Sequence, residues 1–264
     1  MGALTRRVVD GIGFTGVFSG ETVFAFTERT GGVSSEPYAS LNLGAHVGDD
    51  PAAVAENRRR ALAALGCDGL ADRLLTANQV HGDHVAVVNG GRDLDCVRDE
   101  LAAGADAVVC TVPDVPVMLL FADCTPVVLT APGGFAVVHS GWRGTLARIS
   151  GKAACVLARE TGSSPEEVSA YVGPHILGSE YEVSDELLHT FCLQFANMNI
   201  TRPARLDMSA AVRTSLEESG VPPCAIHDEQ LSTMSRNDRF FSYRAENGVC
   251  GRHGAIAYMP SARS

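Results

Sequence analysis

Short apolar runs rich in β-branched residues recur along the chain and predict a set of strands. Residues 8–25 mix valine, phenylalanine and isoleucine with glycines, which indicates short strands joined by turns. Similar runs follow in the middle of the chain, at 105–111, 117–121, 127–130 and 135–138. We expect further strands at 80–88, around a break at Gly82-Asp83, at 169–172 and at 254–259.

Helical spacing of apolar residues predicts helices between these strands. The clearest helix begins after Asp49 or Asp50, has Pro51 in its first turn and stops at Gly66. The same signals predict helices at 145–159, after a capping Ser184, and at 207–219. Residues 27–48 show no periodicity and are rich in glycine, serine and asparagine, so they indicate a long functional loop.

This order of elements predicts one mixed α/β (α+β) domain over residues 1–264. We expect a central mixed β-sheet core flanked by helices, because the connections are too irregular for an alternating β/α barrel. Residues 1–8 and 261–264 are expected to be flexible tails.

Composition narrows the classes of function. A formal net charge of -10 opposes a broad electrostatic attraction to nucleic acid or to an anionic membrane. The most apolar run, residues 115–122, is too short to span a bilayer, and the first 14 residues lack a signal-peptide pattern. We therefore expect a cytoplasmic protein without nucleic-acid or membrane partners, and the sequence leaves both a monomer and a homodimer open. In that compartment most of the eight cysteines are interpreted as buried thiols.

Three potential metal ligands stand beside the ends of predicted strands: His81, Cys124 and His139. Two imidazoles and a thiolate suit zinc or copper better than magnesium or calcium. Three protein ligands leave a fourth position on the metal for water, as in catalytic zinc sites. The metal lowers the pKa of that water to near 7. The long spacing between the three residues also permits a capping histidine, a core cysteine and a turn histidine with no metal.

The segment His-Ser-Gly-Trp-Arg-Gly at 139–144 joins a predicted strand to a predicted helix and contains the only tryptophan of the chain. Arg143 and the N-terminus of the following helix could together bind an anion such as phosphate. Trp142 is either a stacking surface for a base or a packing anchor.

A series of motifs agrees in order and spacing with one bacterial family. The motifs are FTERTGGVS at 26–34, SLNLG at 40–44, VGDDP at 47–51, NR at 57–58, QVHG at 79–82, ADA at 105–107, ADCTP at 122–126, HSGWRG at 139–144, GP at 173–174, YEV at 181–183 and RFFSYR at 239–244. With these motifs, the sequence resembles the bacterial laccase-domain family, also called polyphenol oxidase-like, YfiH-like or purine nucleoside phosphorylase-like proteins.

The resemblance implies a YfiH-like, cysteine-hydrolase-type fold, related to that of cytotoxic necrotizing factor. It implies that His81, Cys124 and His139 bind a metal, usually zinc, with copper as the alternative, and serve in catalysis. The implied substrates are purine nucleosides and phosphate, with phosphorolysis of adenosine, inosine, guanosine or methylthioadenosine and deamination of adenosine.

Other polar residues of the motifs are candidates for the same site. Asp123, beside Cys124, is the first candidate for proton transfer, and a structural carboxylate that accepts from backbone amides is the alternative. The candidates for substrate contact are Arg29, Asn42, Arg58, Gln79, Arg143 and Arg244.

Four positions depart from the family pattern, and other classes of protein stay open. Ser140 stands where alanine is more usual beside His139, a minor change. Glu180 stands where cysteine is common, Ser232 where a Cys-Thr pair is usual, and Ala245 where a second arginine often follows Arg244. The alternatives are a metal-free cysteine hydrolase with Cys124 as nucleophile, a copper-dependent polyphenol oxidase and a metal-stabilised binding module. A four-copper centre needs about ten histidines by the usual ligand sets, and the chain has 8.

Overall fold

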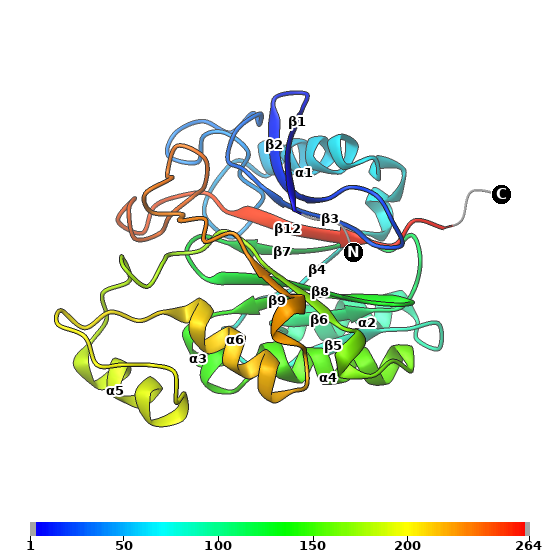
Figure 1. Ribbon diagram of the computed structural model, residues 1–264. Coiled ribbons are helices and arrows are strands. Elements are labelled where there is room, and N and C mark those ends of the chain that lie inside the picture. The colour runs from blue at the N-terminus through cyan, green and yellow to red at the C-terminus, as the bar shows by residue number, and fades with distance from the viewer. Residues whose placement is uncertain (1–3, 262–264) are drawn as a thin grey trace.

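The computed structural model describes residues 4–261 and contains two mixed six-stranded sheets (Figure 1). The first sheet has the order β1 (Thr5–Val9), β2 (Ile12–Val17), β3 (Val23–Thr27), β12 (His253–Tyr258), β7 (Val117–Phe121) and β4 (Leu75–Thr76). The second has the order β11 (Ile226–Asp228), β10 (Ser169–Val172), β8 (Thr125–Ala131), β9 (Gly134–Ser140), β6 (Ala107–Cys110) and β5 (Val85–Val88).

The two sheets pack face to face around one apolar core. Phe24 of β3 and Tyr171 of β10 meet across the interface with ring centroids 4.7 Å apart. Phe121 of β7 and Val137 of β9 belong to the same buried cluster. Because β7, β8 and β9 are buried on both faces, they read in the sequence as continuous apolar runs.

Helices cover the outer faces of both sheets, which gives four layers (Figure 1). α1 (Pro51–Leu65) packs on the first sheet, and α4 (Ile149–Thr161) and α6 (Met208–Glu218) pack on the second. The remaining elements are α2 (Leu94–Ala103), α3 (Trp142–Leu146), α5 (Asp185–Gln194) and the 3₁₀ turns Asp68–Arg73, Pro165–Glu167 and Pro223–Ala225. The mixed α+β class with outer helices is thus confirmed, with the strands divided between two sheets.

The helix at 51–65 is confirmed together with its caps. The Asp50 side chain accepts a hydrogen bond from the Ala52 amide, and Gly66 ends the helix in the left-handed region at φ 79°. The expected helix at 145–159 is two helices, since the chain turns at Arg148, where φ is 62°. Apolar spacing alone could not reveal that break.

Three other expectations need correction. Residues 80–84 are loop, and only Val85–Val88 of the expected strand at 80–88 pairs, with β6. α2 was not anticipated. Residues 5–8, expected in a flexible tail, belong to β1, which pairs with β2, while residues 1–3 and 262–264 lie outside the described residues.

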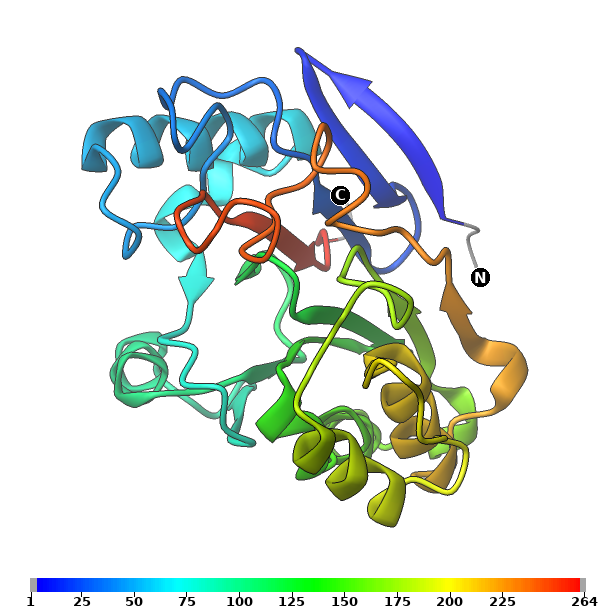
Figure 2. The ribbon, with the colours of Figure 1, turned by 90° about the vertical axis from the view of Figure 1, so that its left-hand side faces the viewer.

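Two long segments, residues 28–50 before α1 and residues 229–252 between β11 and β12, lie side by side at one end of the sheets (Figure 2). The Arg29 amide donates to the carbonyl of Arg239, and the Leu43 amide donates to the carbonyl of Arg252. Across residues 4–261, none of the helices combines the length and apolar character required to cross a membrane.

Candidate metal centre and its cavity

His81, Cys124 and His139 converge although they come from distant parts of the sequence. Cys124 lies in the bend between β7 and β8, and His139 lies near the end of β9, opposite Pro126 of β8. His81 lies in the loop before β5 with φ 58°. The potential ligand atoms of the three side chains lie within 4.8 Å of one another.

The geometry of this group fits a tetrahedral metal. Cys124 Sγ lies 3.7 Å from His81 Nε2. Zinc bond lengths of about 2.3 Å to sulfur and about 2.0 Å to nitrogen place two tetrahedral ligands about 3.5 Å apart. Among the residues that the structure describes, this is the one group of three or more histidine, cysteine or acidic side chains placed to hold a metal.

Asp106 holds two of the three ligands in position. Its buried carboxylate accepts from the backbone amides of Val80, His81 and Gly82, at 3.2, 3.0 and 2.7 Å. The same carboxylate lies 2.7 Å from His139 Nδ1. Because Nδ1 donates to this carboxylate, Nε2 is the His139 nitrogen that would bind a metal, giving up its proton as the metal binds, the arrangement of carboxylate–histidine–zinc triads.

Gly141 allows the His81 ring to approach β9. A Cβ atom at Gly141 would lie 2.8 Å from His81 Cδ2, closer than side-chain carbons pack. The His81 and His139 rings meet edge to face, with centroids 4.8 Å apart. The absence of a side chain at Gly141 is therefore required for the position of His81 in the site.

The three side chains influence one another's ionisation. Burial opposes ionisation of Cys124, but His139 and His81 outweigh it and lower the pKa of the thiol to about 6. Burial likewise disfavours charge on His139, yet Cys124 and Asp106 raise the pKa of this imidazole to about 9. A thiolate is therefore available at neutral pH, as metal binding or nucleophilic attack requires.

The three residues open into a cavity of about 1230 Å³. Its lining includes apolar and aromatic groups, among them Trp142, Ile176, Tyr181 and Met208. The lining also contains five arginines and one carboxylate, Asp123; the arginines are Arg58, Arg98, Arg143, Arg244 and Arg252. In a chain with a net charge of -10, this local excess of cations favours an anionic ligand.

Four of the six residues expected to contact substrate line this cavity: Arg58, Gln79, Arg143 and Arg244. The Gln79 amide bonds both backbone groups of Leu120 at 2.8 Å, which fixes the strand before Cys124. Arg244 donates to the Glu182 carbonyl, and Arg143 stacks on Trp142 with its guanidinium carbon 4.3 Å from the ring centroid.

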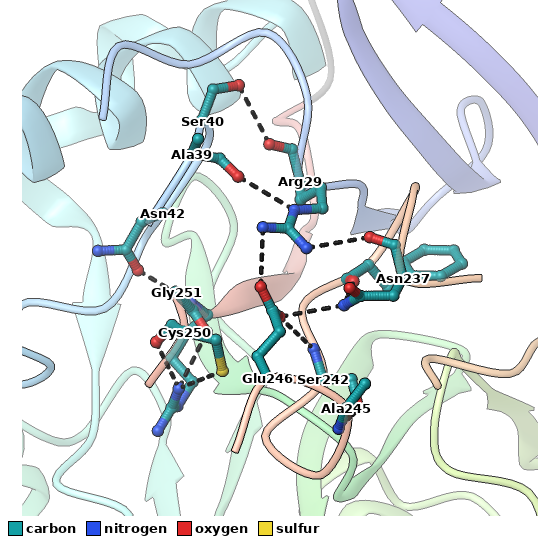
Figure 3. Close-up of polar contacts among 12 residues, drawn as sticks. Arg29, Ala39, Ser40, Asn42, Asn237, Ser242, Ala245, Glu246, Cys250 and Gly251 are labelled. Atoms are coloured by element: carbon teal, nitrogen blue, oxygen red, sulfur yellow. Dashed lines mark hydrogen bonds and ion pairs between the residues drawn. The ribbon is translucent and has the colours of Figure 1, made fainter. Parts of the chain in front are cut away.

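Arg29 and Asn42 lie outside the cavity lining. Figure 3 shows the Arg29 guanidinium directed at the carbonyls of Ala39 and Asn237 and at Glu246, whose carboxylate is 3.0 Å away. Asn42 is fully buried and bonds Gly44, Asp49 and the Arg252 amide. Both side chains connect the loops around the cavity, so direct contact with substrate is not supported for either.

Asp123 lines the cavity with φ 84°, and its side chain is already engaged. One carboxylate oxygen accepts from the Thr233 hydroxyl at 2.6 Å, and the other accepts from the Arg244 amide at 2.7 Å. These bonds match the structural alternative weighed for this residue. A role in proton transfer stays a prediction.

The expected anion site at a helix N-terminus is weakened by the shortness of α3. α3 has 5 residues, too few for a substantial helix dipole, and Trp142 packs beside the buried cluster of Leu188, Phe191 and Phe195. Arg143 itself stays exposed at the cavity.

The sequence reasoning missed Asp106, Tyr181, His46 and Arg252 as residues of the site or its cavity. Asp106 and Tyr181 stood in recognised motifs, and a charged residue directly before a strand as apolar as 107–110 was a usable signal. Two of the departures from the family pattern meet each other outside the cavity lining: Ser232 Oγ donates to a Glu180 carboxylate oxygen at 2.5 Å.

Comparison with known proteins places this chain in a family. The family model described as multi-copper polyphenol oxidoreductase laccase matches residues 23–260. A purine nucleoside phosphorylase of Deinococcus radiodurans is 36% identical over 241 residues, which covers 89% of this chain and 88% of the relative. Another, from Streptomyces coelicolor, is 38% identical over 244 residues, 89% of this chain and 95% of the relative.

A solved structure has the same fold. YlmD from Geobacillus stearothermophilus superimposes with a TM-score of 0.82 at 30% sequence identity, over 91% of this chain and 93% of that chain. The expected YfiH-like fold is thereby confirmed.

Proposed function

Because the chain belongs to the multi-copper polyphenol oxidoreductase laccase family, we propose that it is a metal-dependent purine nucleoside phosphorylase that also deaminates adenosine. The proposed substrates are adenosine, inosine, guanosine and methylthioadenosine, together with phosphate. The convergence of His81, Cys124 and His139 at a cavity lined by arginines carries this proposal.

The side chains suit zinc first and copper second. A thiolate and two imidazoles form a borderline-to-soft set, and the three leave one position open. When bound, such a metal supplies Lewis acidity and lowers the pKa of water. His81, Cys124 and His139 would hold it, and Asp106 would orient His81 and His139.

Phosphorolysis requires two groups to be held in line. A phosphate oxygen forms a bond to C1′ of the ribose while the bond from C1′ to the purine nitrogen breaks. The electron pair of that bond moves to the purine, which takes up a proton. Cavity arginines orient the phosphate and stabilise its charge, and Trp142 and Tyr181 offer aromatic faces to the purine.

Deamination at the same site replaces the C6 amino group of adenosine with the oxygen of water, and ammonia leaves. One proton of the water moves to the departing nitrogen, and the other ends on N1 of the purine. Asp123 is our candidate for that transfer, because it lines the cavity and adjoins Cys124.

A metal-free cysteine hydrolase is the second candidate function. The lowered pKa of Cys124 and the 3.7 Å contact with His81 Nε2 are also what a nucleophile and its base require. We rank it second because the three convergent side chains match a metal site and because Asp106 holds the His139 tautomer that suits ligation.

We place the enzyme in the cytoplasm, as a monomer or homodimer, without nucleic-acid or membrane partners. All eight cysteines are free in the described structure, which suits a reducing compartment.

Incubation of the purified protein with inosine and phosphate tests the proposal. We expect hypoxanthine and ribose 1-phosphate in equal amounts, and adenosine should yield adenine and inosine. Absence of these products with metal-loaded protein, over all four nucleosides, would reject the proposed activity in favour of a binding protein or a hydrolase.

A further inference from the structure

Two arginines of the cavity, Arg58 and Arg252, are held in place without a carboxylate partner. Arg98 alone among the five cavity arginines forms an ion pair within the described residues, with Asp95. Arg58 Nε instead donates to the Leu43 carbonyl at 2.9 Å. Arg252 Nη1 donates to the carbonyls of Cys250 and Gly251, each at 2.9 Å. Carbonyls fix the position of a guanidinium but leave its positive charge uncompensated.

The same short loop anchors both arginines. The Leu43 amide donates to the Arg252 carbonyl, and the Leu43 carbonyl accepts from Arg58. Asn42 Oδ1 accepts from the Arg252 amide at 2.8 Å, and Figure 3 shows Asn42 directed toward Gly251. Gly44 leaves room for the arginine, since a Cβ there would lie 2.8 Å from Arg252 Cγ. The two cations are therefore positioned by the fold.

His46 adds a neutral donor at the same place. It lines the same cavity as an exposed side chain, and its partial desolvation and the charges of Arg252 and Arg58 lower its pKa. Burial also lowers the pKa of Arg58, which shows that this guanidinium has lost part of its hydration. An oxyanion would give the guanidinium groups of Arg58 and Arg252 the negative partner and the hydrogen bonds that they lack.

Arg143 and Arg244, the other unpaired arginines of the cavity, are less well prepared. Both are exposed, and their guanidinium groups lie over the rings of Trp142 and Tyr181. Arg244 also donates to the Glu182 carbonyl, whereas the described structure shows no hydrogen bond that fixes the Arg143 guanidinium. Arg58 and Arg252 hold a fixed position, so an anion bound there gives up less freedom to form bonds.

We propose that Arg58, Arg252 and His46 form a binding site for a phosphate-type oxyanion, and that free inorganic phosphate occupies it. The assignment to free phosphate rests on the phosphorylase function proposed above. Asn42, expected to contact substrate, acts here as a positioning residue that holds the backbone of Arg252.

Titration calorimetry with inorganic phosphate and no nucleoside tests this site. The metal-loaded protein is compared with Arg58→Gln and Arg252→Gln, and with Arg59→Gln as matched control. Arg59 lies next to Arg58 on α1 but is exposed and paired with Glu56, so its replacement removes the same charge outside the cavity. Loss of charge-assisted hydrogen bonds should weaken phosphate binding about tenfold or more in each cavity variant, and less than about twofold in the control.

Melting temperature and metal content show whether each variant is folded. Arg58→Gln changes a helix surface, so it provides the test even if Arg252→Gln does not fold. Phosphate affinities in both cavity variants equal to that of Arg59→Gln would overturn the proposal.

Two further measurements are needed. One distinguishes free inorganic phosphate from the phosphate group of a nucleotide, and the other distinguishes failure of the anion site from failure of the proposed phosphorylase function. Binding of adenosine 5′-monophosphate but not of inorganic phosphate, with loss in the cavity variants, would overturn the assignment to free phosphate. Phosphorolysis with an unchanged KM for phosphate in both variants would reject this site and leave the proposed function standing. Phosphate binding that the variants lose, without any phosphorolysis, would support the site and reject the function.

Discussion

Asp106 and His139 form a buried pair in which a carboxylate oxygen lies 2.7 Å from the imidazole Nδ1. His139 also donates its backbone amide to the Asp106 carbonyl at 2.7 Å. The carboxylate simultaneously accepts from the amides around His81. One side chain thus sets the ring orientation of one proposed ligand and the loop position of another.

Replacement of Asp106 by asparagine should therefore weaken metal binding. The new NH₂ group faces donors in either orientation. On one side lie the backbone amides of Val80 and Gly82, and on the other lie the backbone amide of His81 and Nδ1 of His139. If it faces His139, the ring must accept at Nδ1 and carry its proton on Nε2, which blocks ligation. We expect a loss of about 10- to 100-fold in zinc affinity, measured by chelator competition.

Glu100→Gln is the control for this variant, since Glu100 pairs with His84 and Arg92 away from the cavity. Equal zinc affinity in Asp106→Asn and Glu100→Gln would refute the positioning role of Asp106.

Cys124 of metal-free protein should react with iodoacetamide at unusually low pH. His139 and His81 lower the thiol pKa to about 6 despite burial, so half-maximal reaction is expected near that pH. In urea-unfolded protein the midpoint should move to the ordinary value of about 8.5. Mass spectrometry of the Cys124 peptide across pH measures both. A shared midpoint in the two states would contradict the proposed thiolate, and added zinc should protect the folded protein.

Arg29→Ala should act on stability rather than on substrate affinity. The variant loses the ion pair with Glu246 and leaves that carboxylate mostly buried without its cation. We expect a reduction of about 2–4 kcal/mol in the free energy of unfolding, measured by urea titration. The KM for nucleoside should change less than in Arg143→Ala. A raised KM with unchanged stability would instead restore the expected substrate contact.

Glu28 should make the fold sensitive to acid. Burial raises the pKa of this carboxyl, but the Arg6 and Arg239 guanidinium groups outweigh it, and the folded pKa lies below the ordinary value. Such a group stabilises the fold above its unfolded pKa of about 4.3, and the contribution disappears as pH falls through the lower folded pKa. Glu28→Gln should flatten the dependence of unfolding free energy on pH between about 5 and 2. An unchanged slope would show that other carboxylates control acid unfolding.

The sequence was most informative where local signals agree with the tertiary structure. Asp50, Pro51 and Gly66 determine α1 almost alone, and the doubly buried strands appeared as uninterrupted apolar runs. The three proposed metal ligands stood out separately beside the ends of predicted strands. Only the motif resemblance joined them into one site, because residues as distant as His81 and His139 meet only through the pairing of β6 with β9. The spacing of residues along the chain does not reveal which strands pair.

The remaining differences concern residues whose surroundings the sequence does not reveal. Arg29 and Arg252 are both arginines in loops. The Arg29 guanidinium is bonded to backbone carbonyls and to the Glu246 carboxylate, whereas Arg252 lines the cavity. The turn at Arg148 that separates α3 from α4 likewise has no glycine or proline to mark it. Such distinctions arise from packing between segments far apart in the chain.

Metal content of active protein purified without added metal tests the central claim most directly. We expect about one zinc ion per chain in the wild type and loss of that ion, together with phosphorolysis, in Cys124→Ser, because removal of one of three ligands leaves too few to retain it. Wild-type protein that contains no metal and still converts inosine and phosphate at full rate would contradict the account.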